Sequence, residues 1–439
     1  MTMELAERQV AVVGLGESGV AAAELCRARG AKVVGFDEAT TIPARDFEVV
    51  LGPLADDALL ESSLVIVSPG VPDKEAMRRA SEAGIEIIGE LELASRFLDA
   101  PIVLVGGTNG KSTVTAWTAA MLEASGKRVF CGGNYGTPLS AAVGHAYDVL
   151  VVEISSFQAE RVPTLHARVH ALLNITDDHL DRYPSFSAYA DAKGNPFVHM
   201  NADDVAVLPF GDEACARQAA RGGARPIRFG AAGEAEVSVE DDHIVDRIHG
   251  TRYPTNALRV RGRHNLMNAC ASVAAARAAG ASEAGVREAL AHFEGLAHRH
   301  VLVAEIGGVR FYDDSKATNV GAAVTALSGM DEERAVLIAG GRDKLGSYAP
   351  LVEALRRRGR ALVVLGEAAD RIASSAAGVL PVERARSMDE AVAIAARLAQ
   401  PCDAVLLSPA CSSFDMFENY KARGDAFVAA VRSLTGARK

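Results

Sequence analysis

The feature that most constrains the fold is an apolar segment that runs into a glycine-rich turn and then a helix. Residues 102–113 read IVLVGGTNGKST. A buried strand, a glycine turn and a helix that begins with a lysine form a phosphate-binding loop. In such a loop backbone N–H groups surround the phosphates, Lys111 neutralises their charge and Ser112 can bind Mg²⁺. Val105 stands where the general pattern has its first glycine, so the loop is a variant. We predict an α/β nucleotide-binding domain around it.

A second candidate for the same site is the carboxylate that ends the apolar segment DVLVVE, residues 148–153. An acid that ends the strand beside a phosphate-binding loop usually completes the Mg²⁺ shell, which points to Glu153. The alternative is an acid that only ends a strand, and the residues alone leave both interpretations open.

A different glycine turn, GLGESG at residues 14–19, follows an apolar run near the N-terminus. Glycines allow the backbone to approach a phosphate at the start of a helix, and Asp37 lies 21 residues past Gly16, where dinucleotide-binding folds hold a ribose hydroxyl. The pattern fits NAD or FAD, another nucleotide, or a purely structural turn. It predicts a phosphate nearby without identifying the ligand.

The rest of the chain alternates short apolar runs with helical segments, which is typical of parallel sheets covered by helices. Its 439 residues correspond to about three domains of roughly 150 residues. We predict domains at residues 1–98, 99–296 and 297–439, with a peripheral sheet within the polar, glycine-rich residues 201–262. The expected strands are residues 9–13, 32–36, 64–67, 85–88, 102–105, 149–152, 309–312, 335–338, 361–364 and 404–407, and the expected helices include residues 20–29, 74–83 and 268–279.

Polar residues cluster after several other apolar runs. NITDDHLDRY, residues 174–183, places His179 among three carboxylates, where it could bind a metal, act as a base or only form hydrogen bonds. Lys193, by itself, reads as a solvated surface lysine. In the last third, residues 313–319, 340–344 and 408–414 each follow an apolar run, and ligands of open α/β sheets bind beyond the carboxyl ends of strands. These three clusters therefore predict one shared pocket.

Charge and composition narrow the class of partner and the compartment. The chain has 46 basic and 56 acidic residues, a net charge of −10, which argues against a nucleic-acid partner. The six cysteines are scattered, and the polar N-terminus is unlike a signal peptide. No uncharged apolar run reaches about 18 residues, the length that a membrane span needs. We expect a cytoplasmic monomer with neither a nucleic-acid nor a membrane partner.

Taken in order, the motifs GGTNGKST, VVEISSFQ, NITDDHLDRY, RHNLMN, DDSKATN, GGRDK and SPACSSFD closely resemble those of the Mur ligases of peptidoglycan synthesis. The resemblance runs nearly end to end. It implies a Rossmann-like N-terminal domain that binds UDP, a central domain with a P-loop ATPase-like parallel sheet, and a Rossmann-like C-terminal domain that binds an amino acid. The NAD interpretation of the first glycine turn is then dropped.

The resemblance also implies the reaction. SPACSSFD followed by NYKARG, residues 419–424, looks most like the branch of the family that adds D-glutamate to UDP-N-acetylmuramoyl-L-alanine. Such an acid–amino-acid ligase uses ATP and two Mg²⁺ ions, and forms an acyl phosphate before the amide. The alternatives are another Mur-type or folylpolyglutamate synthetase-like amide ligase, or a non-catalytic nucleotide-binding regulator.

Site residues follow from the same resemblance. Lys111, His179 and Lys193 would be catalytic, and the Mg²⁺ ligands would be Ser112, Glu153, His179 and Lys193 as a carbamate. The residues implied for ATP are Gly107, Thr108, Asn109, Gly110, Lys111, Ser112, Thr113, Asn268, Arg299 and Asp314. Those implied for the UDP substrate are Gly14, Leu15, Gly16, Ser18, Asp37, Glu38, Ser68 and Asn134. Those implied for D-glutamate are Lys316, Thr318, Lys344, Ser413 and Tyr420.

Overall fold

The computed structural model describes residues 3–178, 182–231, 235–260, 262–343 and 346–436. The chain forms two compact units. The first unit comprises Met1–Ile175, Ser187–Ala257 and Asn268–His292, and the second comprises Thr176–Phe186, Leu258–Met267 and Phe293–Lys439. The described residues contain three sheets, two in the first unit and one in the second. This arrangement confirms the predicted α/β class, whereas the exact domain boundaries stay predictions.

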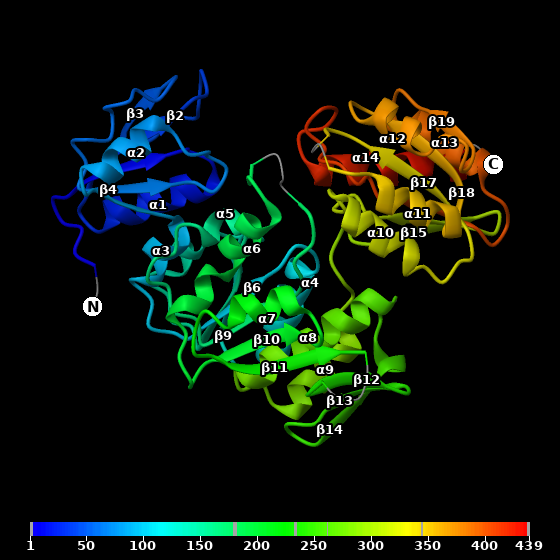
Figure 1. The fold of residues 1–439 in the computed structure, drawn as a ribbon, viewed down its shortest axis with the longest axis horizontal. Coiled ribbons are helices and arrows are strands. Elements are labelled where there is room, and N and C mark those ends of the chain that lie inside the picture. Colours follow the sequence, from blue (N-terminus) through cyan, green and yellow to red (C-terminus); the bar gives the residue numbers. More distant parts are fainter. Residues whose placement is uncertain (1–2, 179–181, 232–234, 261, 344–345, 437–439) are drawn as a thin grey trace. The chain divides into compact units, whose positions relative to one another are not determined.

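The N-terminal sheet, blue in Figure 1, is parallel and has the strand order β3-β2-β1-β4-β5. Residues of β1 alternate between two cores: Val10 and Val12 pack on the face covered by α1, and Ala11 and Val13 on the face covered by α2. Helices on both faces of a parallel sheet are the expected Rossmann-like arrangement. The elements are β1 (Gln9–Val13), α1 (Glu17–Ala28), β2 (Lys32–Asp37), β3 (Glu48–Leu51), β4 (Leu64–Val67), α2 (Glu75–Glu82), β5 (Glu86–Ile88) and α3 (Glu90–Ser95).

The central sheet has the order β14-β13-β12-β11-β10-β9-β6-β8-β7. Residues 201–262 do not form a separate peripheral sheet as predicted, because β10 pairs in parallel with β9 and β11 to β14 extend the same sheet (Figure 1). The strands are β6 (Ile102–Gly106), β7 (Val129–Gly133), β8 (Val149–Glu153), β9 (Val169–Leu172), β10 (Val205–Pro209), β11 (Arg225–Gly230), β12 (Val237–Glu240), β13 (His243–Asp246) and β14 (Thr251–Pro254).

Helices connect these strands and follow the last of them. They are α4 (Lys111–Glu123), η1 (Leu139–Ala142), α5 (Ser156–Ala159), α6 (Phe186–Gly194), η2 (Asn195–His199), α7 (Glu213–Ala219), η3 (Thr255–Ala257), α8 (Arg263–Ala278) and α9 (Glu283–His292). Helix α8 begins five residues before the predicted helix at residues 268–279. No helix among the described residues is long and apolar enough to cross a membrane.

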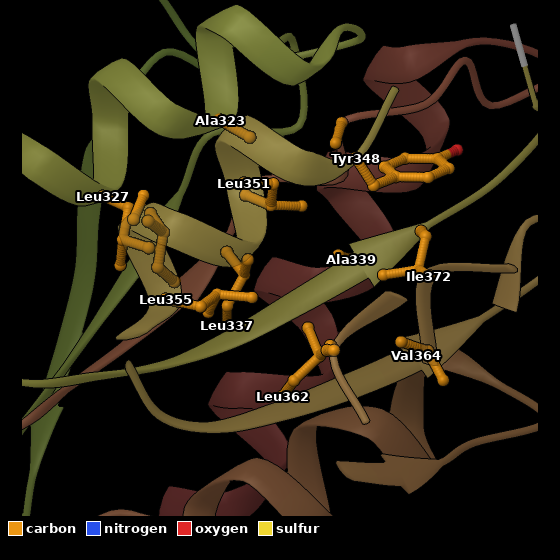
Figure 2. Close-up of a cluster of buried hydrophobic side chains, with 14 of the residues drawn as sticks. Ala323, Leu327, Leu337, Ala339, Tyr348, Leu351, Leu355, Leu362, Val364 and Ile372 are labelled. Carbon is orange, nitrogen blue, oxygen red and sulfur yellow. The ribbon is translucent and has the colours of Figure 1, made fainter. Parts of the chain in front are cut away.

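The sheet of the second unit has the order β15-β16-β20-β17-β18-β19, with β15 antiparallel to β16 and the others parallel. Figure 2 shows one face of its core, where Leu337 and Leu362 of the strands pack with Leu351 and Leu355 of α11. The elements are β15 (Val301–Ile306), β16 (Val309–Asp313), α10 (Val320–Ser328), β17 (Ala335–Gly340), α11 (Ala349–Arg358), β18 (Gly359–Leu365), α12 (Ala369–Ser375), β19 (Val382–Arg384), α13 (Met388–Leu398), β20 (Ala404–Leu407) and α14 (Tyr420–Gly436).

Candidate active site

The predicted phosphate-binding loop connects the buried strand β6 to the start of α4. Two of its glycines have backbone angles that favour glycine, with φ of +130° at Gly107 and +87° at Gly110. A Cβ atom on Gly110 would lie 2.6 Å from Oδ1 of Asn268, so the loop backbone passes directly against that side chain. The structure therefore brings together the loop and Asn268, which are 158 residues apart in the chain.

Asn174 anchors the loop from the neighbouring strand. It follows β9, which pairs with β6, and its main-chain oxygen accepts from the N–H of Thr108 at 2.9 Å. Its side chain accepts from the N–H of Asn109 at 2.9 Å and donates to the oxygen of the same residue at 3.0 Å. Sequence reasoning did not name Asn174 as a site residue. The available signal was an amide side chain directly after an apolar run.

Ser112, Glu153 and Asn134 form a hydrogen-bonded group beside the loop. The carboxylate of Glu153 ends β8, which pairs in parallel with β6, and it is 2% exposed. One oxygen accepts from the Ser112 hydroxyl, and the other accepts from Nδ2 of Asn134 at 2.6 Å. A carboxylate and a hydroxyl are oxygen ligands of the kind that Mg²⁺ prefers. The interpretation of Glu153 as a residue that only ends a strand does not account for this contact.

Lys193 is buried, so its interpretation as a solvated surface lysine is wrong. Its side chain extends from α6 and its Nζ atom donates to the main-chain oxygen of Gly107 at 2.7 Å. The ammonium also lies 4.7 Å from the ring centre of Tyr189, whose hydroxyl is 3.0 Å from the Thr108 hydroxyl. Lys193 and Tyr189 therefore both contact the phosphate-binding loop. His179, the third predicted catalytic residue, lies outside the described residues.

The α-helix that carries Lys193 ends one residue beyond it. Helix α6 ends at Gly194 and passes into the 3-10 turn η2. A Cβ atom on Gly194 would lie 2.1 Å from the side-chain oxygen of Gln218, so α7 packs closely here. The Phe197 ring then stacks on His170 at 4.3 Å between ring centres. Burial first, and the Lys193 charge second, lower the pKa of His170 to about 3, so this imidazole is neutral.

The N-terminal glycine turn is held by residues from two neighbouring strands. Gly14 has φ of +85°, and the Ser68 hydroxyl donates to its oxygen at 2.6 Å. Asp37 accepts from the N–H of Leu15 at 2.7 Å, so its carboxylate supports the turn. Glu38, also predicted for the UDP substrate, pairs with Lys74. Gly16 and Ser18 lie at the start of α1 in the same turn.

In the second unit, Arg423 ties two of the predicted polar clusters together. Its buried guanidinium donates to the hydroxyl and the main-chain oxygen of Ser315 at 3.0 and 2.8 Å. It also donates to the oxygens of Cys411 at 3.1 Å and Ser412 at 3.2 Å. Burial lowers the pKa of Arg423 to about 10. Sequence reasoning missed this role, because an isolated arginine in a helical segment carries no signal of it.

Other predicted residues lie around this cluster. The Lys316 ammonium is 4.0 Å from the ring centre of Tyr420. Ser413 is buried in the loop between β20 and α14. Asp314 is buried and accepts from the Ser408 hydroxyl at 2.8 Å, and burial raises the pKa of Asp314 to about 7. Lys344 lies outside the described residues. Thr318 follows in the same turn as Lys316, and Arg299 interacts electrostatically with Asp314.

The NITDDHLDRY and DDSKATN motifs also meet in the second unit. The side-chain amide of Asn319 donates to Asp178 at 2.9 Å. Asn319 begins α10, where its own side-chain oxygen accepts from the N–H of Ala322. Two segments that sequence reasoning treated as separate are therefore in direct contact.

Three family descriptions match the chain in succession. They are "Mur ligase MurD-like, N-terminal domain" at residues 8–89, "Mur ligase middle domain" at residues 105–276 and "Mur ligase, glutamate ligase domain" at residues 298–411.

Two curated relatives are similar over nearly their whole length. A UDP-N-acetylmuramoylalanine–D-glutamate ligase of Trichlorobacter lovleyi is 40% identical, over 98% of this chain and 100% of the relative. One of the same name from Desulfosudis oleivorans is 43% identical, over 98% of each chain.

Solved structures share the fold at low identity. UDP-N-acetylmuramate-alanine ligase from Thermotoga maritima has a TM-score of 0.63 at 20% identity, over 98% of this chain and 100% of that one. Folylpolyglutamate synthase from Mycobacterium tuberculosis, complexed with ADP, has a TM-score of 0.61 at 17% identity, over 77% of this chain and 91% of that one. With full-length relatives above 40% identity and all three family descriptions matched, this chain belongs to the Mur ligase family.

Proposed function

We propose that this protein uses ATP to join D-glutamate to UDP-N-acetylmuramoyl-L-alanine in peptidoglycan synthesis. The observation that carries the proposal is the full-length similarity to relatives bearing that name, at 40–43% identity. The phosphate-binding loop with Lys111, Ser112 and Glu153 supports the proposal, because these residue types fit the binding of ATP phosphates and Mg²⁺. The folylpolyglutamate synthetase-like alternative has only the shared fold in its favour.

The reaction needs ATP because a carboxylate is a poor electrophile. The terminal carboxylate oxygen of the substrate attacks the γ-phosphorus of ATP, the bond between the β,γ-bridging oxygen and that phosphorus breaks, and ADP leaves. The amine of D-glutamate then attacks the acyl phosphate carbon, the C–N bond forms, phosphate leaves with the carboxylate oxygen, and the amine gives up a proton. Catalysis rests on positioning and charge stabilisation, the role of the loop N–H groups and Lys111.

The donor set fits a first Mg²⁺ ion at Ser112 and Glu153. Both oxygens that would hold it already converge in one hydrogen bond, and Glu153 is a buried carboxylate. An ion there would supply positive charge beside the ATP phosphates. For the second ion we propose His179 and Lys193. An ammonium cannot bind a cation, so Lys193 fits only as a carbamate, the product of its neutral amine with CO₂.

We assign the other subsites by the motifs they carry. The turn with Gly14, Ser68 and Asp37 would hold the uridine diphosphate, and Asn134 the muramoyl part. Asn268, Arg299 and Asp314 would contact the nucleotide of ATP. Lys316, Thr318, Lys344, Ser413 and Tyr420 would bind D-glutamate, for which the lysines offer charges to a dicarboxylate. Cytoplasmic location and a monomeric state stay predictions.

A coupled assay of ADP release tests the reaction. We expect turnover only when ATP, UDP-N-acetylmuramoyl-L-alanine and D-glutamate are all present, with mass spectrometry showing one added glutamyl group. Equal turnover with L-alanine or diaminopimelate in place of D-glutamate would overturn the assignment. The Lys111→Ala variant distinguishes an enzyme from a regulator. If the protein is an enzyme, the wild type forms amide product and the variant loses turnover. If it is a nucleotide-binding regulator, neither the wild type nor the variant forms amide product.

A further inference from the structure

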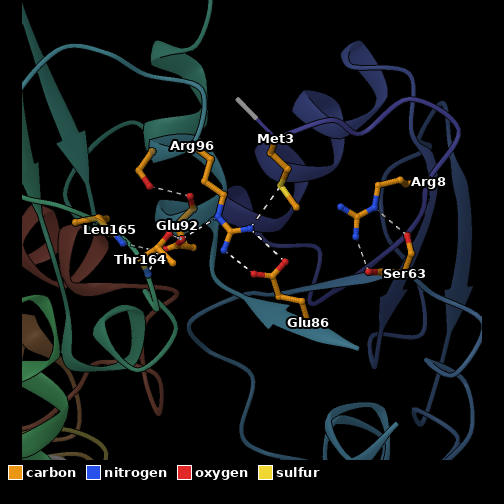
Figure 3. A network of polar contacts seen from close by, with 9 residues as sticks. Met3, Arg8, Ser63, Glu86, Glu92, Arg96, Thr164 and Leu165 are labelled. Carbon is orange, nitrogen blue, oxygen red and sulfur yellow. Dashed lines mark hydrogen bonds and ion pairs between the residues drawn. The ribbon is translucent and has the colours of Figure 1, made fainter. Parts of the chain in front are cut away.

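Helix α3 belongs to the core of the N-terminal sheet but sends two carboxylates into the part of the first unit built on the central sheet. Leu93 packs in the same core as β1 and α1. Glu92, the residue before Leu93, is fully buried. Its carboxylate accepts from the N–H groups of Thr164 at 3.1 Å and Leu165 at 2.9 Å, and from the Thr164 hydroxyl (Figure 3). Arg96 pairs with Glu92 and with Glu86 of β5.

Glu90 makes a second connection, to a different segment of the central part. One carboxylate oxygen accepts from the N–H of Ser140 at 2.5 Å, and the other has no hydrogen-bond partner among the described residues. Burying a carboxyl group without full hydrogen bonding costs free energy, and here burial raises the pKa of Glu90 to about 7. Three residues beyond Ser140, Val143 packs against the core of the N-terminal sheet. The turn η1 is therefore attached to the N-terminal sheet by a polar and an apolar contact.

Ser140 is joined to Asn134 by a short, tightly bonded loop. The N–H of Gly133 donates to the oxygen of Thr137 at 2.8 Å, and the N–H of Asn134 donates to the oxygen of Glu153 at 2.9 Å. A Cβ atom on Gly132 would lie 2.2 Å from the oxygen of Thr137, so the backbone at the two ends of this loop is in close contact. A displacement of Ser140 would therefore be passed to Asn134.

We propose that Glu90 is a positioning residue that holds the Asn134 loop at a set separation from the N-terminal glycine turn. This inference rests on the proposed function, in which the turn holds the UDP end of the substrate and Asn134 its muramoyl end. A ligand that occupies two subsites gains affinity from their alignment, and it loses that gain when the spacing is free to vary. A ligand that occupies only one subsite is indifferent to the spacing.

Calorimetric titration of the full-length protein tests this coupling with two probes, UDP and UDP-N-acetylmuramoyl-L-alanine. In Glu90→Ala we expect the Kd for the complete substrate to rise about tenfold, while the Kd for UDP and for ATP changes less than about twofold. Glu90→Gln should restore wild-type affinity, because its amide oxygen can accept from Ser140. Glu82→Ala, an exposed carboxylate on α2, is the matched control.

Two results would overturn the inference: an unchanged Kd for the complete substrate in folded Glu90→Ala, or equal weakening of both probes. If Glu90→Ala does not fold, Glu90→Asp serves instead, since its shorter side chain keeps the carboxyl group but cannot reach the Ser140 N–H. The same selective tenfold loss is then expected. The proposed function fails separately, if the wild type forms no glutamyl product with these substrates.

Discussion

The Nζ atom of Lys193 lies 2.7 Å from the main-chain oxygen of Gly107, so a buried cation is bonded to the phosphate-binding loop itself. An ammonium in this position donates a proton to the loop oxygen. Conversion to a carbamate would replace the donor by a carboxylate-like group. The surroundings of this lysine, rather than its local sequence, support the role that we propose for it.

Replacing Lys193 tests that role. We expect Lys193→Ala to have low ligase activity, because the carboxylate-like ligand proposed for the second Mg²⁺ ion is lost. Short carboxylic acids such as acetate should restore part of the activity by occupying the vacated space. Lys32→Ala, which removes an exposed lysine of β2, should behave as the wild type. Full activity of Lys193→Ala without added acid would refute the carbamate.

Glu153 is expected to govern the dependence on Mg²⁺. In Glu153→Gln the amide keeps the shape and can still bond to Ser112 and Asn134, but the negative charge is lost. We expect the Mg²⁺ concentration for half-maximal activity to rise about tenfold or more. Replacing a residue that only hydrogen-bonds to a metal ligand already lowers metal affinity by about tenfold, and replacing a direct ligand should lower it at least as much. Titration of activity with Mg²⁺ measures this, and circular dichroism should show an unchanged fold. An unaltered Mg²⁺ dependence would count against the assignment.

Gly110 allows a test of the loop geometry with a close control. Both Gly110 and Gly126 have positive φ, but a Cβ atom would clash with Asn268 only at Gly110, and at Gly126 it would meet open space. Each Gly→Ala change should cost about 1–2 kcal/mol of stability from the backbone conformation. Only Gly110→Ala should also weaken ATP binding, as measured by calorimetry. Equal ATP affinity of the two variants would contradict the packing described.

The raised pKa of Glu90 predicts that the stability of the protein depends on pH. Burial raises its pKa from 4.5 to about 7, so between these values the folded protein holds a proton that the unfolded chain has released. The contribution of the neutral Glu90 carboxyl to the free energy of unfolding is therefore fully present below pH 4.5, and it is lost as the pH rises through about 7.

Glu90→Gln stays neutral and should not show this loss. Relative to it, the wild type should lose about 3 kcal/mol of unfolding free energy across that interval. Urea denaturation of both proteins at pH 4.5 and pH 8 gives the difference, and other titrating groups, such as Asp314, cancel in the comparison. Parallel pH profiles would show that Glu90 titrates normally.

Arg423 should control D-glutamate binding without touching it. Arg423→Ala removes the donors to Ser315, Cys411 and Ser412, so the loops that carry Lys316 and Ser413 lose their shared anchor. We expect the KM for D-glutamate to rise about 10- to 100-fold, since small displacements of binding groups have effects of that size. Arg386→Ala, at an exposed position, is the control. An unchanged KM would mean that the loops hold their positions unaided.

Much of the framework could be predicted because it depends on local pattern. The strands at residues 9–13, 64–67 and 404–407 have the predicted bounds, since each is a short apolar run with polar or turn-forming residues at its ends. The phosphate-binding loop was also predictable, because its glycines, Lys111 and Ser112 all lie within residues 106–112. Strand β9 was missed, and the strands between residues 205 and 254 were assigned to the wrong sheet. The residues of a strand do not specify which other strand pairs with it.

The sequence by itself determined the α/β class, the loop and the order of motifs that identifies the family. Only the tertiary structure decided that Lys193 is buried against Gly107, that Asn174 holds the loop, and that Glu90 joins the N-terminal sheet to Ser140. The physical reason is the distance along the chain. Strand and turn preferences act over a few residues, whereas these contacts join residues 50 to 86 positions apart, and burial there changes what each side chain can do.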